Sequence, residues 1–238
     1  MPSTGKAVRV AVIDSGVHAA HPHVRGVADG VQITSDLEIR ADFVDRLGHG
    51  TAVTAAIKEK APLVDIIAVK VFDRALSTSA EALARGIEVA VDHGANLINL
   101  SLGTTRQEHR AVLEPAVELA SGAGVAIIAA APSADEPWLP GALPEVIAVA
   151  LDWECPRDRY RLIVLESGRP AFSASGYPRP IPGVPPERNL KGLSFAVANL
   201  TGFAALAIEG RGRITSEELV TILAEAVRGR GRSPIPDP

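Results

Sequence analysis

Five apolar segments of strand length, separated by longer and more polar stretches, constrain the fold of this chain more than any other feature. They are rich in Val, Ile and Ala, and they cover residues 7–14, 65–71, 96–103, 124–131 and 145–150. Continuous apolar runs of this length are typical of parallel strands that are buried on both faces. Helical patterns lie between them, and strand–helix alternation predicts helices on both sides of the sheet. The predicted fold class is therefore α/β: a three-layer sandwich with a mostly parallel central sheet.

Capping patterns predict where three of the helices begin. A threonine followed three positions later by Glu, the pattern of a capping box, occurs at 78–81, 105–108 and 215–218. Pro115 is expected to bend or restart the second of these helices. The Pro-rich stretch 152–192 predicts irregular structure, within which the alternating Arg157, Arg159 and Arg161 indicate the solvent face of an edge strand. A further helix is expected from about Ser194. Because no repeat or linker divides the chain, we predict a single domain over 1–228 and a flexible tail over 229–238.

The composition limits the partners that this chain can have. The formal net charge is −4 and no basic stripe stands out apart from a short Arg run near the end, so we expect no nucleic-acid partner. The only cysteine, Cys155, excludes an intrachain disulfide and a zinc cage of thiolates. No run approaches the roughly 18 apolar residues of a membrane span, and no signal-peptide pattern precedes the first strand. We expect a cytoplasmic protein with no membrane association and no cofactor.

Histidines near the start of the chain are candidates for a metal site. His18, His21 and His23 lie close together, but they flank a proline in a predicted loop. We interpret them as loop residues and expect no metal site.

Three polar residues stand where a nucleophilic serine and its partners can be built. Asp14 follows the first strand, His49 lies between two glycines at a predicted helix start, and Ser194 opens the helix in GLSFAVANLTG. Each alone has a structural explanation, as a turn cap, a buried histidine or an incidental hydroxyl. Together they supply what nucleophilic catalysis by serine requires, because a base must activate the serine and an acid must orient the base.

The local sequences around these three residues resemble those of the subtilisin-like serine peptidases. In that family the Asp lies in a V-D-[ST]-G motif, here VIDSG, and the His lies in GHGT, here 48–51, preceded by Asp45. The family's serine motif GTSMAAPHVAG is matched by GLSFAVANLTG. Three further segments, LINLSLG, VAIIAAAPS and PAFSASGYP…IPG, match VINMSLG, VVVAAAGN and ASFSNYGP…APG. The resemblance covers residues 7–208 with six motifs in order, and it implies a subtilisin-like fold.

The resemblance also implies a role for each residue of the site. Ser194 would attack a peptide carbonyl, His49 would carry its proton to the leaving amine, and Asp14 would orient His49. The backbone N–H of Ser194 and the side chain of Ser133 would donate hydrogen bonds to the oxyanion. The implied substrate is a peptide or protein in extended conformation. The residues implied to bind it are Ser101, Leu102, Gly103, Ala129, Ala130 and Pro132.

Departures from the family pattern leave more than one function open. Pro132 and Ser133 stand where the family has Gly-Asn, and loss of the Asn donor costs about 10²–10³ in rate in subtilisin. Leu193 replaces the Thr before the serine, and Ala52 replaces the second His of HGTH. These differences favour a slow, selective endopeptidase that processes a precursor or leader peptide. The alternatives are a weakened peptide-binding or partner subunit and a transpeptidase.

Overall fold

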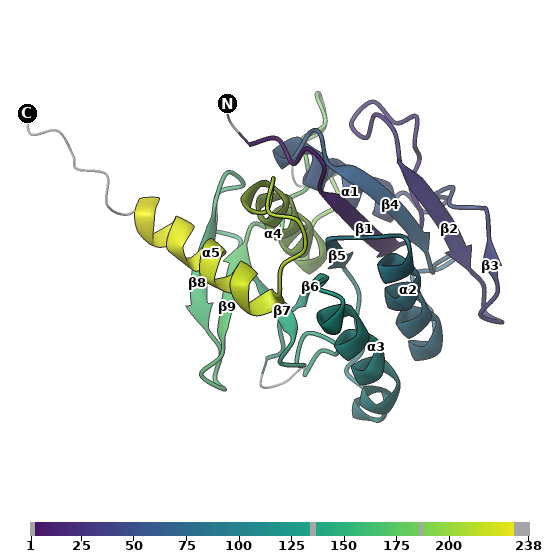
Figure 1. Ribbon diagram of the computed structural model, residues 1–238. Helices are drawn as coiled ribbons and strands as arrows, with labels where there is room; N and C mark the ends of the chain where they lie inside the picture. Colours follow the sequence, from purple (N-terminus) through teal and green to yellow (C-terminus); the bar gives the residue numbers. More distant parts are fainter. Residues whose placement is uncertain (1–2, 134–136, 186–187, 231–238) are drawn as a thin grey trace, which may run out of the picture.

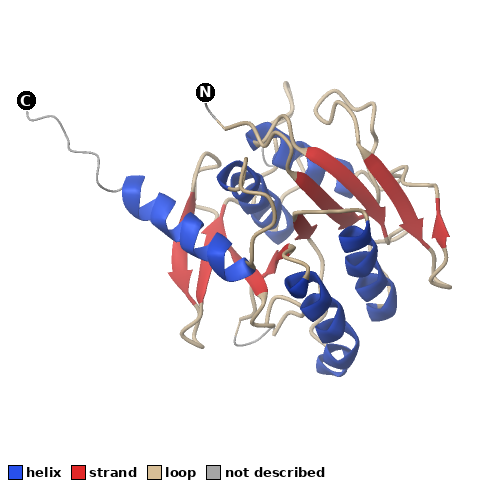
Figure 2. Ribbon diagram, in the orientation of Figure 1, coloured by secondary structure: helices blue, strands red, loops and turns tan. Residues whose placement is uncertain are grey.

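The structure is a computed structural model that describes residues 3–133, 137–185 and 188–230 (Figures 1 and 2). Its strands are β1 (Arg9–Asp14), β2 (Asp29–Ile33), β3 (Ile39–Arg40), β4 (Asp65–Lys70), β5 (Leu97–Leu100), β6 (Ala126–Ala130), β7 (Val146–Leu151), β8 (Tyr160–Val164) and β9 (Pro170–Ala174). Its α-helices are α1 (His49–Lys60), α2 (Ala80–Asp92), α3 (Arg110–Gly122), α4 (Leu193–Ala207) and α5 (Ser216–Arg230). A short 3₁₀ helix, Gln107–His109, precedes α3.

The strands form one twisted sheet in the order β3-β2-β4-β1-β5-β6-β7-β9-β8. Every neighbouring pair is parallel except β2–β3 and β8–β9, the antiparallel pairs at the two ends of this order. The five segments predicted from the sequence correspond to β1, β4, β5, β6 and β7, and all five lie inside the sheet. The predicted mostly parallel sheet is therefore confirmed.

Helices cover both faces of the sheet (Figure 1). On one face, α2 and α3 pack over a core that includes Ile13, Ile67, Ile98 and Ile127. On the other face, α1, α4 and α5 enclose a second core, whose strand residues include Val10 and Ile128. Alternate residues of one strand supply the two cores, which explains why the inner strands are apolar throughout. The predicted three-layer arrangement is confirmed.

Several elements differ from the sequence prediction. The stretch 152–192, expected to be irregular apart from an edge strand at 157–161, contains β8, which begins at Tyr160, and β9. The two strands pair as a hairpin with its turn near Gly168. The second helix begins at Arg110 instead of near Thr105, and it continues through Pro115. Residues 229–230, expected in the tail, belong to α5, whereas 231–238 lie outside the described residues. That 1–228 form a single domain remains a prediction.

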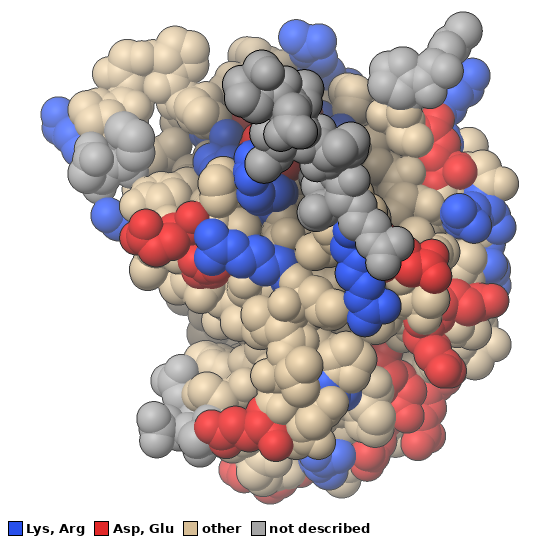
Figure 3. All heavy atoms as spheres, turned by 90° about the vertical axis from the view of Figure 1, so that its left-hand side faces the viewer, with Lys and Arg blue, Asp and Glu red and all other residues tan. Residues whose placement is uncertain are grey.

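The capping box of the last helix is present. The Thr215 hydroxyl accepts the N–H of Glu218 at 3.2 Å, and the Glu218 carboxylate accepts the N–H of Thr215 at 2.8 Å. At the start of α2, the cap is Ser79, which accepts the N–H of Ala82 at 3.1 Å. On the face shown in Figure 3, basic and acidic side chains are interspersed, which agrees with the small net charge.

Candidate active site

The candidate site lies at the carboxyl edge of the parallel strands, where their following loops meet. Asp14 is the last residue of β1, and Ser101 directly follows β5. His49 is the first residue of α1, and Ser194 is the second residue of α4. Because α1 and α4 pack side by side on one face of the sheet, their N-termini present His49 and Ser194 at the same edge.

Asp14 and His49 form a buried pair. Nδ1 of His49 lies 2.8 Å from Oδ1 and 2.9 Å from Oδ2 of Asp14, whose side chain is fully buried. The N–H of Ser15 donates to the same carboxylate at 2.7 Å. Gly50 allows this close approach, because a Cβ there would overlap the carbonyl oxygen of Gly16 and crowd Asp14. The pairing predicted from the sequence is thus present in the geometry.

The electrostatic environment favours the protonated form of His49. Burial alone would lower the pKa of His49, but the hydrogen bond and the charge of Asp14, together with the charge of Asp45, outweigh burial. The pKa of His49 is therefore raised above its ordinary value of 6.5.

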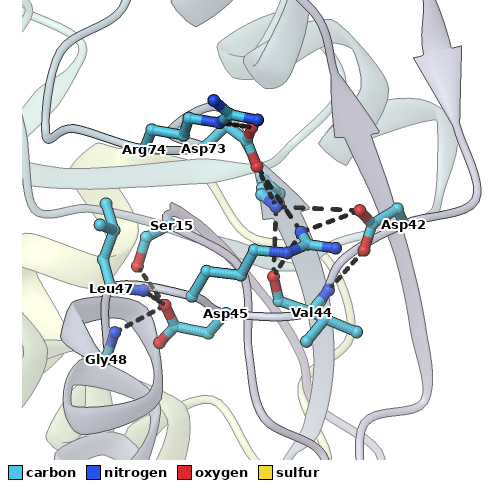
Figure 4. A network of polar contacts seen from close by, with 10 residues as sticks. Ser15, Asp42, Val44, Asp45, Leu47, Gly48, Asp73 and Arg74 are labelled. Atoms are coloured by element: carbon cyan, nitrogen blue, oxygen red, sulfur yellow. Dashed lines mark hydrogen bonds and ion pairs between the residues drawn. The ribbon is translucent and has the colours of Figure 1, made fainter.

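Asp45 organises the loop that leads into His49 (Figure 4). Gly48, which precedes α1, has no side chain with which to cap the helix, and Asp45 takes that role. Its carboxylate accepts five hydrogen bonds of 2.6–2.9 Å, from the N–H groups of Leu47, Gly48 and Thr51 and from the hydroxyls of Ser15 and Thr51. Burial alone would raise the pKa of Asp45, but these hydrogen bonds outweigh it and lower the pKa.

Lys70 ties the same loop to the sheet. It is the last residue of β4, it is paired with Asp14 in the β1–β4 ladder, and its side chain is fully buried. Its ammonium donates to Asp73 Oδ1 at 2.8 Å and to the carbonyl of Val44 at 3.2 Å, with Asp42 at 3.9 Å. The hydrogen bond from Lys70 lowers the pKa of Asp73. The carboxylates of Asp73 and Asp42 therefore neutralise the charge of the buried ammonium.

Ser194 makes reciprocal contacts with Ser101. Its hydroxyl donates to the carbonyl oxygen of Ser101 at 3.1 Å, and the Ser101 hydroxyl donates to the carbonyl of Ser194 at 3.2 Å. The side chain of Asn99 donates to the Ser101 hydroxyl at 2.8 Å and accepts from Thr201 at 3.0 Å. Gly192, with φ of 146°, turns the chain into α4. The start of α4 is thus fastened to the end of β5.

A cleft of about 610 Å³ brings the predicted residues together. Six of its lining residues belong to the set predicted from the sequence: His49, Ser101, Leu102, Gly103, Ala130 and Ser194. Sequence reasoning missed the others: Phe72, the segment 76–80, Leu83, Thr104, Arg106, His109, Trp138, Leu193 and Val197. Leu193 and Val197 lie in the serine motif without having been assigned to the cleft, whereas the place of most of the others depends on contacts between distant segments.

Three residues that were predicted to bind the substrate or the oxyanion are not among the residues that line the cleft. Ala129 is buried in the core shared with α2 and α3, because neighbouring residues of a strand point to opposite faces and Ala130 is the one that meets the cleft. The expected contact of Ala129 with substrate is therefore corrected. Pro132 is half-buried and Ser133 is exposed in the turn after β6. Their parts in substrate and oxyanion binding remain predictions.

The described residues also bear on metals and membranes. Nowhere in the described ranges do three or more His, Cys, Asp or Glu side chains gather in a way that could hold a metal ion. In the same part of the chain, no helix combines the length and the apolar character that crossing a bilayer requires.

The fold and the site together define a class: a doubly covered α/β sheet with an Asp–His pair and a helix-borne serine at one cleft, as in the subtilisin-like serine peptidases. The profile of the Subtilase family matches residues 5–151. Thermitase of Thermoactinomyces vulgaris is 30% identical over 251 residues, which cover 95% of this chain and 84% of thermitase. The chain therefore belongs to the subtilase family of subtilisin-like serine peptidases.

Two further comparisons describe the extent of the similarity. The thermostable alkaline protease of Halalkalibacterium halodurans is 38% identical over 136 residues, which cover 53% of this chain and only 36% of that protease. The crystal structure of a cold-adapted subtilisin-like serine proteinase has a TM-score of 0.71 at 21% identity, over 94% of this chain and 83% of that one. This structural similarity supports the fold.

Proposed function

We propose that this chain is a serine endopeptidase that hydrolyses peptide bonds through an acyl-enzyme on Ser194. The observation that carries the proposal is the contact of His49 Nδ1 with both carboxylate oxygens of Asp14. Because Nδ1 is hydrogen-bonded to the carboxylate of Asp14, Nε2 is the His49 nitrogen that can exchange a proton with the serine. Since His49 and Ser194 line the same cleft, the proton can come from the serine.

The first step begins from a resting hydrogen bond. The Ser194 hydroxyl donates to the carbonyl of Ser101, so attack requires rotation of the Ser194 side chain toward Nε2 of His49. Breaking one such hydrogen bond costs about 1 kcal/mol, which a bound substrate readily offsets. As Oγ bonds to the substrate carbonyl carbon, Nε2 takes its proton and then gives it to the leaving amine. Water, deprotonated by the same nitrogen, hydrolyses the ester and restores the hydroxyl.

We propose that main-chain groups bind the substrate and supply the first hydrogen-bond donor to the oxyanion. The N–H of Ser194 belongs to the first turn of α4, where N–H groups have no acceptor within the helix. We propose that it donates to the oxyanion and that Ser133 supplies a second donor. The cleft has the segment 76–80 on one side and 101–104 on the other. An extended peptide can pair there with Ser101–Gly103 as an added strand.

Selectivity is the finer part of the proposal. Pro132 and Ser133 replace the family's Gly-Asn, so oxyanion support is weaker and turnover slower than in subtilisin. Slow turnover suits the processing of a precursor or leader peptide in the cytoplasm better than general digestion. Rapid degradation of unfolded casein would contradict this part of the proposal while leaving the endopeptidase assignment intact.

A second candidate is a peptide-binding or partner subunit with little turnover, and the hydrogen bond of the Ser194 hydroxyl to Ser101 favours it. A transpeptidase would share the acyl-enzyme and differ in the acceptor amine.

A fluorophosphonate probe, which phosphonylates activated serines, tests the proposal. We expect one probe molecule per chain in the wild type and none in S194A or H49A. The matched control is S77A, which removes another cleft serine and should retain full labelling. A wild-type protein that is folded by circular dichroism but remains unlabelled would refute the endopeptidase and support the binding subunit.

A further inference from the structure

The segment 138–141 crosses the ends of β5 and β6 and carries a tryptophan into the cleft. The N–H of Thr104 donates to the carbonyl of Leu139 at 3.0 Å, and the N–H of Leu139 donates to the carbonyl of Thr104 at 2.8 Å. Gly141 lies directly against the carbonyl of Ala130, where a Cβ would overlap that oxygen. The backbone that follows the indole is therefore fixed against the two strand ends.

Trp138 occupies space between the strand ends, in the same cleft as Ser194. Its half-buried side chain lines the cleft together with Ala130 and Ser194. Its Cε3 atom lies 3.4 Å from the point where a Cβ on Gly103 would stand, so the edge of the ring packs against the Gly103 backbone. A substrate side chain that entered between Gly103 and Ala130 would meet the indole.

We infer that Trp138 narrows the pocket for the substrate side chain that precedes the cleaved bond, so that the enzyme accepts Gly or Ala there and rejects larger residues. The inference rests on the proposed function, because the pocket is defined by a carbonyl placed at Ser194 Oγ and a strand paired with Ser101–Gly103. In that arrangement the preceding side chain points into the space beside Ala130, which the indole shares.

The charge of the cleft excludes one further class of substrate. No Asp or Glu is found among the described residues that line it, whereas Arg106 and His109 do line it. A Lys or Arg side chain before the cut would therefore lack an ion-pair partner as well as room. Small uncharged residues remain the side chains that fit.

Peptide aldehydes, which add reversibly to an activated serine, provide the test. Two tetrapeptide aldehydes that differ only in a terminal Ala or Phe compete with the fluorophosphonate for Ser194. We expect the wild type to bind the Ala aldehyde at least about tenfold more tightly, since pocket size discriminates by roughly 10–200-fold. W138A should reverse or abolish this preference. The matched control is W153F, at the only other tryptophan, which packs on Tyr177 and should keep the wild-type preference.

W153F also gives a readout that leaves position 138 unchanged. In that variant Trp138 is the only tryptophan, so its fluorescence should change as the Ala aldehyde saturates the site. If W138A fails to fold, W138L and this fluorescence titration decide the question. Three results would overturn this inference and leave the proposed function intact. They are a labelled wild type that prefers the Phe aldehyde, a folded W138A or W138L with an unaltered preference, and no change in the fluorescence of Trp138. A wild type without any labelling would overturn the proposed function and the inference with it.

Discussion

Replacing Asp45 by Ala is predicted to destabilise the protein by about 2–4 kcal/mol and to slow labelling of Ser194 about tenfold. The loss of a helix-capping side chain costs about 0.5–2 kcal/mol. The two hydroxyls that donate to Asp45 also lose their acceptor, and because both hydrogen bonds are only partly buried, each loss costs about 1 kcal/mol, the lower end of the range for an unsatisfied donor. Labelling slows because His49 is the first residue of the helix that Asp45 caps.

Equilibrium urea unfolding and the second-order rate of fluorophosphonate labelling measure the two effects. The matched control is D42A, which removes another carboxylate from the same loop. The Asp42 carboxylate mainly contacts Arg46 and the N–H of Val44. It should lose less than about 1 kcal/mol, as expected for an exposed ion pair. Equal losses in D45A and D42A, or a D45A loss below about 0.5 kcal/mol, would refute the capping argument.

The pH dependence of this difference has a definite sign. The pKa of Asp45 is lowered in the folded protein, so its contribution is present above the unfolded pKa of about 3.9. That contribution is lost as the pH falls through the lower folded pKa. The stability gap between wild type and D45A should therefore be constant near neutral pH and shrink in acid. A gap that widens below pH 4 would contradict the assignment.

Two further predictions concern the groups next to this loop. Because the pKa of His49 is raised, the rate of Ser194 labelling should increase with pH through a midpoint above 6.5. In D14N the midpoint should fall and the labelling rate should drop by about 10⁴, and a pH–rate profile measures both effects. D73A leaves the fully buried Lys70 ammonium without its closest carboxylate, so it should lower the free energy of urea unfolding by about 1–3 kcal/mol. K70M should lower it by less, and the reverse order would contradict the ion-pair argument.

The sequence predicted the inner strands, but of the outer strands it indicated only an edge strand near β8, and the difference has a physical reason. Strands β1 and β4 to β7 are flanked on both sides and covered on both faces, so nearly all their residues are apolar. Strand β8 lies at the end of the sheet, and its Arg161 and Val164 are exposed. Strand β3 has only two residues, both exposed. Their formation depends on pairing with a neighbour, which one chain segment does not encode.

The residues of the site also differ in whether the sequence alone predicts them. Asp14, His49 and Ser194 could be predicted because each stands at the boundary of an element that the sequence itself marks. Trp138 could not, because its place beside Gly103 depends on a backbone pairing between Thr104 and Leu139, 35 residues apart. The hydrogen bond between Ser194 and Ser101 depends on a side-chain rotamer, about which sequence carries no signal.

The separation of His49 from Ser194 follows from helix packing instead of loop conformation. Each residue lies at the start of a helix, and α1 and α4 pack against each other along their length. At Gly202 the helices approach so closely that a Cβ would lie 3.1 Å from the carbonyl of Ile57. Asp45, which also accepts the hydroxyl of Ser15 just after β1, fastens the start of α1. Ser101, just after β5, fastens the start of α4, so both helix starts are tied to strand ends of one sheet. The proposed base and nucleophile are thus positioned by two packed helices.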